Sequence, residues 1–107
     1  MKKPTDFTKL MTSYLGSYLP LQRNVSKNTI SSYCDTFRLL LIFLRDEKAI
    51  NIEKVQIQDF SPGLIREYLS WLGHDRHCGI STKNQRLAAL RAFFKYVEVE
   101  SPQHMLL

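Results

Sequence analysis

The sequence predicts an all-α protein folded as a compact four-helix bundle, and three observations carry this prediction. Apolar residues recur at three- and four-residue steps in four separate stretches, which is the spacing of one helix face. Capping residues, prolines and glycines stand between these stretches, where helices begin and end. The weakly alternating segment 49–60 has no partner strand, so we expect a packed loop or short turn there instead of a hairpin.

The first expected helix is amphipathic. Thr5 or Asp6 can cap its start, and Pro20 is expected to close it. Its apolar stripe comprises Phe7, Leu10, Met11, Tyr14, Leu15, Tyr18 and Leu19. Such a stripe is typical of a helix that packs on a core. The aromatic surface beyond what a core needs is available to dock on a neighbouring protein.

The second expected helix follows a linker over 21–25, has Ser26 as its N-cap and runs to about Lys48. The unbroken apolar run 39–44 in its second half must be buried on most sides, which makes this the central helix of the bundle. Its first half is polar and carries Lys27, Asn28, Thr29, Ser31 and Ser32. Such groups suit a phosphate or a base edge, and they are equally ordinary at a helix start.

The third expected helix starts with Ser61 as N-cap and Pro62 as first helical residue, and Gly73 is expected to end it. Trp71 lies among apolar residues at helical spacing, so we expect it in the core.

The loop 73–79 is the one place where the sequence suggests metal or catalytic chemistry. His74, His77 and Cys78 are zinc-type ligands at close spacing. A structural zinc site needs a fourth ligand, and a Cys–His nucleophilic pair needs an orienting group and an oxyanion donor, none of which is evident. We therefore predict a polar inter-helix loop, with no catalytic residue, no metal and no cofactor.

The fourth expected helix spans 80–97, and Ser101 and Pro102 stop it. Leu87, Leu90, Phe94 and Val97 form its apolar stripe, with Phe93 on the flank. The remaining surface carries Lys83, Asn84, Gln85, Arg86, Arg91 and Lys95 without an acidic residue. Ser81 or Thr82 can cap the first turn, where free N–H groups and the helix dipole attract a phosphate. This basic face suits an anionic ligand, although solvated helices often carry the same residues.

The composition is that of one ordered domain with an anionic partner. A chain of 107 residues needs no metal or disulfide, because it buries roughly two thirds of its unfolded surface. Its net charge of +5 favours nucleic acid or an anionic membrane. The longest apolar run is too short to span a bilayer and no signal-peptide pattern follows Met1, so we expect a cytoplasmic protein without a membrane partner. Cys34 and Cys78 are expected to be reduced thiols.

Two stretches, SKNTISSYCDTFRLLLIFL and STKNQRLAALRAFFKYV, together resemble the N-terminal core-binding domain of the tyrosine recombinase, or phage integrase, family. The first contains a T-x-x-x-Y helix start, here Thr29 to Tyr33. The second contains R-L-x-A-L-R-x-F-F-x-Y, here Arg86 to Tyr96. The order and spacing of the two motifs carry the resemblance, which extends from about Phe7 to Pro102.

The resemblance implies a SAM-like helical domain over 1–102. Residues 103–107 are then expected to start a linker to a C-terminal catalytic domain, which is absent from the 107-residue sequence. In the family, that domain supplies the catalytic Arg, Lys and His residues and the nucleophilic tyrosine. We therefore expect the present domain to be catalytically inert. In the family the first helix contacts the adjacent subunit of a recombinase tetramer, which would use Tyr14 and Tyr18. The isolated domain is expected to be monomeric.

The resemblance also implies double-stranded DNA as the partner, because the second and fourth helices of the family face the major groove. By position, the implied DNA-binding residues are Lys27, Asn28, Thr29, Ser31 and Ser32 on one helix and Thr82, Lys83, Gln85, Arg86 and Arg91 on the other. Lys and Arg neutralise phosphates, while Asn28 or Gln85 would present an amide to adenine and Arg86 a guanidinium fork to guanine.

Two other functions stay open: a helical protein–protein interaction module with a basic face, and a small metal-binding protein. DNA binding predicts that log K falls by about 0.9 per log unit of salt for each phosphate contacted. Protein docking would centre on Tyr14 and Tyr18 and survive charge reversal at Arg86. Metal binding requires stoichiometric zinc that is lost on substitution of His77 or Cys78.

Overall fold

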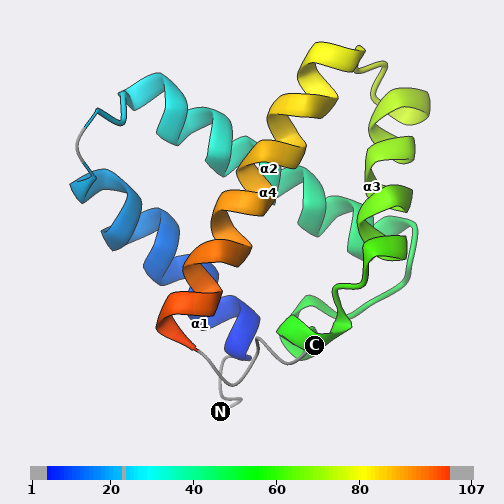
Figure 1. Ribbon diagram of the computed structural model, residues 1–107. Helices are drawn as coiled ribbons and strands as arrows, with labels where there is room; N and C mark the ends of the chain where they lie inside the picture. Colours follow the sequence, from blue (N-terminus) through cyan, green and yellow to red (C-terminus); the bar gives the residue numbers. More distant parts are fainter. Residues whose placement is uncertain (1–4, 23, 102–107) are drawn as a thin grey trace.

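The computed structural model describes residues 5–22 and 24–101, and four α-helices dominate them (Figure 1). They are α1 (Asp6–Ser13), α2 (Lys27–Asp46), α3 (Pro62–Asp75) and α4 (Ile80–Glu100). No strand occurs in these described ranges, which confirms the all-α four-helix prediction. The expected linker at 103–107 and the expected stop at Pro102 lie outside the described residues.

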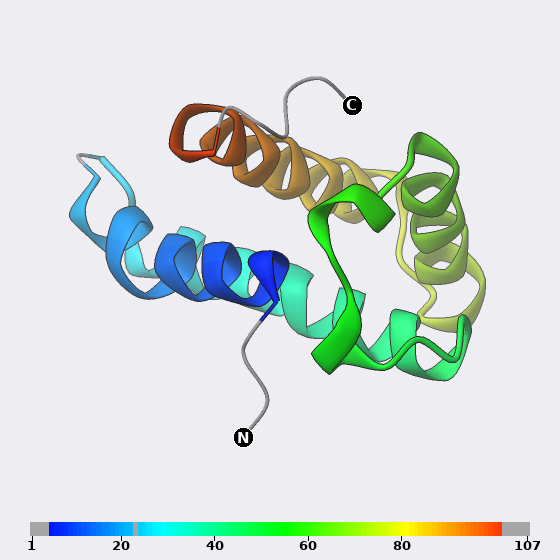
Figure 2. The same ribbon diagram turned by 90° about the horizontal axis from the view of Figure 1, so that it is seen from below.

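The two long helices, α2 and α4, cross each other, and the shorter helices cover opposite ends of this crossing (Figures 1 and 2). α1 packs on the second half of α4, where the Ser13 and Tyr96 hydroxyls are hydrogen-bonded at 3.0 Å. α3 packs on the other side, where the Tyr68 hydroxyl donates a hydrogen bond of 2.9 Å to the carbonyl of Thr36 on α2. The first halves of α2 and α4 therefore stay uncovered by α1.

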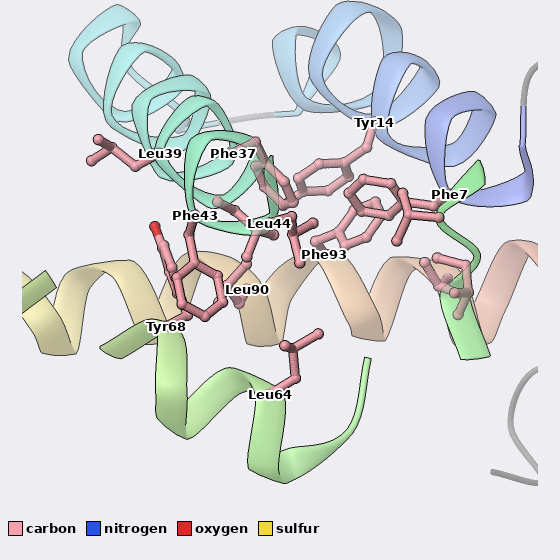
Figure 3. Close-up of a cluster of buried hydrophobic side chains, with 14 of the residues drawn as sticks. Phe7, Tyr14, Phe37, Leu39, Phe43, Leu44, Leu64, Tyr68, Leu90 and Phe93 are labelled. Atoms are coloured by element: carbon pink, nitrogen blue, oxygen red, sulfur yellow. The ribbon is translucent and has the colours of Figure 1, made fainter. Parts of the chain in front are cut away.

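The core is rich in aromatic rings, and Phe93 of α4 lies at its centre (Figure 3). Its ring contacts those of Phe7, Tyr14 and Phe37, with centroids 5.9, 5.5 and 5.0 Å away. The prediction that Phe93 flanks the apolar stripe of α4 was wrong. Because α4 is covered by both α1 and α2, its buried face turns toward Phe93 and includes Tyr96.

Three of the predicted helix starts are confirmed. The side-chain oxygens of Thr5, Ser26 and Ser61 each accept a backbone hydrogen bond of 3.1 Å in the first turn of α1, α2 and α3, respectively. The predicted cap of α4 was wrong, because Gly79 is the N-cap and makes no side-chain bond. Ser81 and Thr82 are instead within the first helical turn.

Two predicted helix ends differ from the structure. After Ser13 the chain continues as a π-helical turn (Tyr14–Tyr18) and a 3₁₀ turn (Leu19–Leu21), so Pro20 lies within the last turn. Gly73 does not end α3, which continues to Asp75. The Lys83 side chain of α4 lies against α3 at Gly73, where a Cβ would be 3.2 Å from the Lys83 ammonium.

The interiors of α2 and of the segment 49–60 agree with the predictions. In the apolar run 39–44, Leu39, Leu40, Phe43 and Leu44 are buried, and the other two residues are half-buried. Segment 49–60 forms two 3₁₀ turns, Ile52–Lys54 and Ile57–Asp59. The backbone N–H of Ile57 donates to the Asp6 carboxylate at 2.9 Å, which fastens this segment to α1.

Candidate nucleic-acid interface

A groove of about 420 Å³ lies between the first halves of α2 and α4. Its walls are Asn28, Thr29, Ser32 and Tyr33 of α2, and Gln85 and Ala88 of α4. We call it the α2–α4 groove. Both helices start on the same, upper side of the molecule in Figure 1. The fold thus brings together four of the predicted DNA-binding residues that are far apart in the sequence.

The amides of Asn28 and Gln85 are the groove's best-placed polar groups. Both residues are exposed, and neither side chain makes a hydrogen bond to any part of the chain that the structure describes. The hydroxyl of Thr29, by contrast, lies 3.0 Å from the Ser26 hydroxyl and belongs to the cap of α2. Because an amide offers a donor and an acceptor side by side, these two side chains can pair with a base edge.

Arg86 is used inside the protein. Its Nη1 atom donates to the carbonyl of Ser32 at 2.9 Å and lies 3.3 Å from the Thr36 hydroxyl, so it joins α4 to α2. Its Nε atom is buried and has no hydrogen-bond partner among the described residues. Arg86 therefore bridges the two helices that form the groove. Sequence reasoning assigned its guanidinium only to DNA.

The carbonyls and hydroxyls near Thr36 connect three helices. Thr36 is fully buried, and its hydroxyl donates to the Ser32 carbonyl at 3.1 Å. The Thr36 carbonyl in turn accepts from Tyr68 of α3. Burial raises the pKa of Tyr68 above its usual value, so this phenol stays protonated and keeps its donor. We call Ser32, Thr36, Tyr68 and Arg86 the interhelical node.

The other predicted DNA-binding residues lie outside the α2–α4 groove. Lys27, Ser31 and Arg91 are exposed, so their side chains are accessible from solvent. Thr82 and Lys83 are half-buried, and Lys83 lies across α3. Sequence reasoning missed two residues that line the groove, Tyr33 and Ala88. Helical spacing could have found them, since Tyr33 follows Thr29 by one turn and Ala88 follows Gln85.

The loop after α3 gives no support for a metal site. Within residues 5–22 and 24–101, no three His, Cys, Asp or Glu side chains are grouped as metal ligands. Cys34 and Cys78 are both free thiols. Trp71 is buried as expected, and the Arg76 guanidinium lies 5.1 Å from the centroid of its ring. None of the helices in the described ranges combines the length and apolarity that a membrane span requires.

Comparisons with known proteins identify similar chains. The model of the family described as phage integrase, N-terminal SAM-like domain, matches residues 13–101. Two proteins of Sinorhizobium fredii, each named as a candidate integrase/recombinase, y4rC and y4rD, are 33% identical over 104 and 93 residues. Tyrosine recombinase XerC of Rickettsia massiliae is 34% identical over 84 residues.

These alignments cover most of the present chain and a smaller part of each relative. They include 97%, 87% and 76% of the chain, in the order given, but only 31%, 33% and 26% of the relatives. No solved structure matches the chain significantly.

Proposed function

The chain belongs to the phage integrase N-terminal SAM-like domain family, and from this we propose that it binds duplex DNA for a tyrosine recombinase or integrase. The observation that carries the proposal is the α2–α4 groove, which gathers Asn28, Ser32 and Gln85 from two separate helices. The net charge of +5 supports it further, because DNA is a polyanion.

In the proposed complex, the first halves of α2 and α4 face the major groove. The amides of Asn28 and Gln85 contact base edges, since each can form two hydrogen bonds with adenine. The exposed Lys27 and Arg91 neutralise backbone phosphates, and the Ser31 hydroxyl donates to another. Arg86 contributes by holding the helices at a fixed separation. Positioning and base contact are thereby divided between different side chains.

The proposal assigns the chemistry of recombination to another part of the parent protein. The chain matches about a third of its Sinorhizobium relatives, which leaves most of their length for other domains. We propose that residues 1–102 form the DNA-binding unit and that 103–107 lead toward a catalytic domain. Without the DNA contacts of a second domain the binding should be weak, so we expect a dissociation constant of about 10⁻⁴ to 10⁻⁶ M for this domain alone.

The test is an NMR titration of the ¹⁵N-labelled domain with short duplex DNA at low and high salt. We expect amide shifts at 27–32 and 82–91 that fade as salt rises. The double substitution Asn28→Ala with Gln85→Ala should weaken these shifts. Gln58→Ala is the matched control, because Gln58 is an exposed amide in the 3₁₀ turn Ile57–Asp59. Unchanged amide shifts at both segments on addition of DNA would contradict the proposal.

A second candidate function is docking on another protein, such as an adjacent recombinase subunit. It is favoured by the exposed apolar side chains after α1, because Tyr18 is 40% exposed and Leu21 82% exposed. Charge reversal by Arg91→Glu should weaken DNA binding and leave such docking intact. Tyr18→Ser with Leu21→Ser should have the opposite effect, as measured by sedimentation and by DNA titration.

A further inference from the structure

A second groove lies on the other side of α4, between α4 and α3. Its volume is about 550 Å³, and it is lined by Arg66, Leu69, Ser70, Gly73 and His74 of α3 and by Lys83 of α4. We call it the α3–α4 groove. Of its lining residues, only Lys83 was predicted to contact DNA. The first half of α4 thus lies between two grooves, and its start is next to the end of α3 (Figure 1).

The polar groups of the α3–α4 groove are suited to an anion. Arg66, Ser70 and His74 follow one another at one-turn spacing along α3, and Lys83 faces them from α4. None of the described residues that line this groove is acidic. Arg66 and Lys83 form no ion pair within the described part of the chain. The neighbouring Glu67 is engaged elsewhere, because its carboxylate pairs with Lys48 at 3.1 Å. Asp75 lines an adjacent cavity, which shares Ser70 and His74 with this groove but neither Arg66 nor Lys83.

The Lys83 side chain lies close to Gly73. The Lys83 side chain lies across the helix at this glycine, where a Cβ would be 3.2 Å from its Nζ and 3.8 Å from its Cδ and Cε. The ammonium of Lys83 therefore lies against the surface of α3 at this glycine. The fold therefore places a lysine and an arginine from different helices along one groove.

We propose that the α3–α4 groove binds a phosphodiester of the DNA backbone beside the bases contacted in the α2–α4 groove. This inference rests on the proposed function and adds α3 to the DNA-binding surface. Arg66 supplies a planar guanidinium fork that matches phosphate oxygens, and Lys83 supplies a point charge. The Ser70 hydroxyl and the His74 imidazole provide further hydrogen-bond donors. A free phosphate ion has the same chemistry, and the experiment below distinguishes the two.

The test measures fluorescence anisotropy of a labelled duplex against the parent chain and Arg66→Gln over a range of salt concentrations. Loss of one phosphate contact should reduce the slope of log K against log salt by about 0.9. Lys9→Gln is the matched control, since it removes one positive charge from an exposed residue of α1, away from both grooves. Its slope should equal that of the parent. Ser70→Ala should weaken binding without changing net charge.

The outcomes separate the two proposals. If the parent shows no salt-dependent binding of DNA, the proposed function and this inference are both overturned. If the parent binds but Arg66→Gln behaves as Lys9→Gln, only the α3–α4 groove proposal is overturned. In a second experiment, inorganic phosphate is titrated into the ¹⁵N-labelled protein at constant ionic strength. Saturable amide shifts at Arg66 and Lys83 in phosphate, with an unchanged DNA slope for Arg66→Gln, would indicate a site for the free ion instead.

Discussion

Removing the Arg86 side chain should destabilise the fold even in the absence of DNA. The short bond from Nη1 to the Ser32 carbonyl is charge-assisted, and such bonds contribute about 1.5 to 3 kcal/mol. In the opposite direction, the substitution removes the buried Nε donor that has no hydrogen-bond partner, and leaving such a donor unpaired costs about 1 to 3 kcal/mol of stability. Loss of the packed aliphatic stem adds about 0.8 kcal/mol for each buried methylene. We expect Arg86→Ala to lower the free energy of unfolding by about 2 kcal/mol.

A second substitution separates the hydrogen bond from the packing. Arg86→Met keeps most of the stem and removes the donors, so it should cost only about 1 kcal/mol. The Ser32 carbonyl is not orphaned in this variant, because the Thr36 hydroxyl still donates to it. Thr36→Val combined with Arg86→Met completes a double-mutant cycle. Its coupling energy should be about 0.5 to 1.5 kcal/mol for side chains that share a network.

The assay is urea unfolding followed by circular dichroism at fixed pH and ionic strength. Gln85→Ala is the control, since Gln85 is an exposed neighbour on the same helix and should change stability by less than about 0.5 kcal/mol. An Arg86→Ala variant as stable as the control would refute the interhelical role. Arg86 would then be free to act as a DNA contact only, and its loss should appear in DNA affinity alone.

Three further substitutions test the core, the node and the groove. Tyr68→Phe should cost about 1 kcal/mol at neutral pH in urea unfolding, because it deletes a buried donor. Burial raises the pKa of Tyr68, so its contribution to stability is fully present below the unfolded pKa near 10 and is lost as the pH rises toward the higher folded pKa. The melting temperature should therefore fall less steeply between pH 8 and 11 in the Tyr68→Phe variant than in the parent. Phe93→Ala should cost about 3 to 5 kcal/mol in urea unfolding, since its ring is fully buried. Gly73→Ala should raise stability by about 0.5 to 1 kcal/mol, because it improves helix propensity and meets only the flexible end of Lys83; a lower melting temperature would contradict this.

The sequence predicted best those parts of the fold that local chemistry decides. Thr5, Ser26 and Ser61 were recognised as N-caps because a hydroxyl before an apolar-periodic stretch satisfies a backbone N–H within three residues. The end of α3 was misplaced for a tertiary reason. A glycine in this context is typical of a helix end, but α3 continues to Asp75 and the Lys83 side chain of α4 lies against the helix at Gly73.

The candidate site could be predicted as two helix faces but not as a groove. Spacing placed Asn28 and Ser32 on one helix and Gln85 on another, and nothing in the sequence fixes where two helices cross. The same limit explains the interpretation of Arg86, which was grouped with Lys83 and Arg91 as one basic face. Charge pattern alone does not distinguish a guanidinium that faces solvent from one that bonds a neighbouring carbonyl.

The interhelical node links the stability of the domain to the geometry of both grooves. Arg86 holds α4 to α2 at the wall of the α2–α4 groove, and Tyr68 holds α3 to α2 on the other side. Both bonds end at α2 within one turn, between Ser32 and Thr36. A shift of α2 at this turn therefore moves Asn28 of the first groove relative to Arg66 and Lys83 of the second. If the domain binds DNA as proposed, substitution of Thr36 or Tyr68 should therefore weaken binding, although neither side chain is proposed to touch DNA.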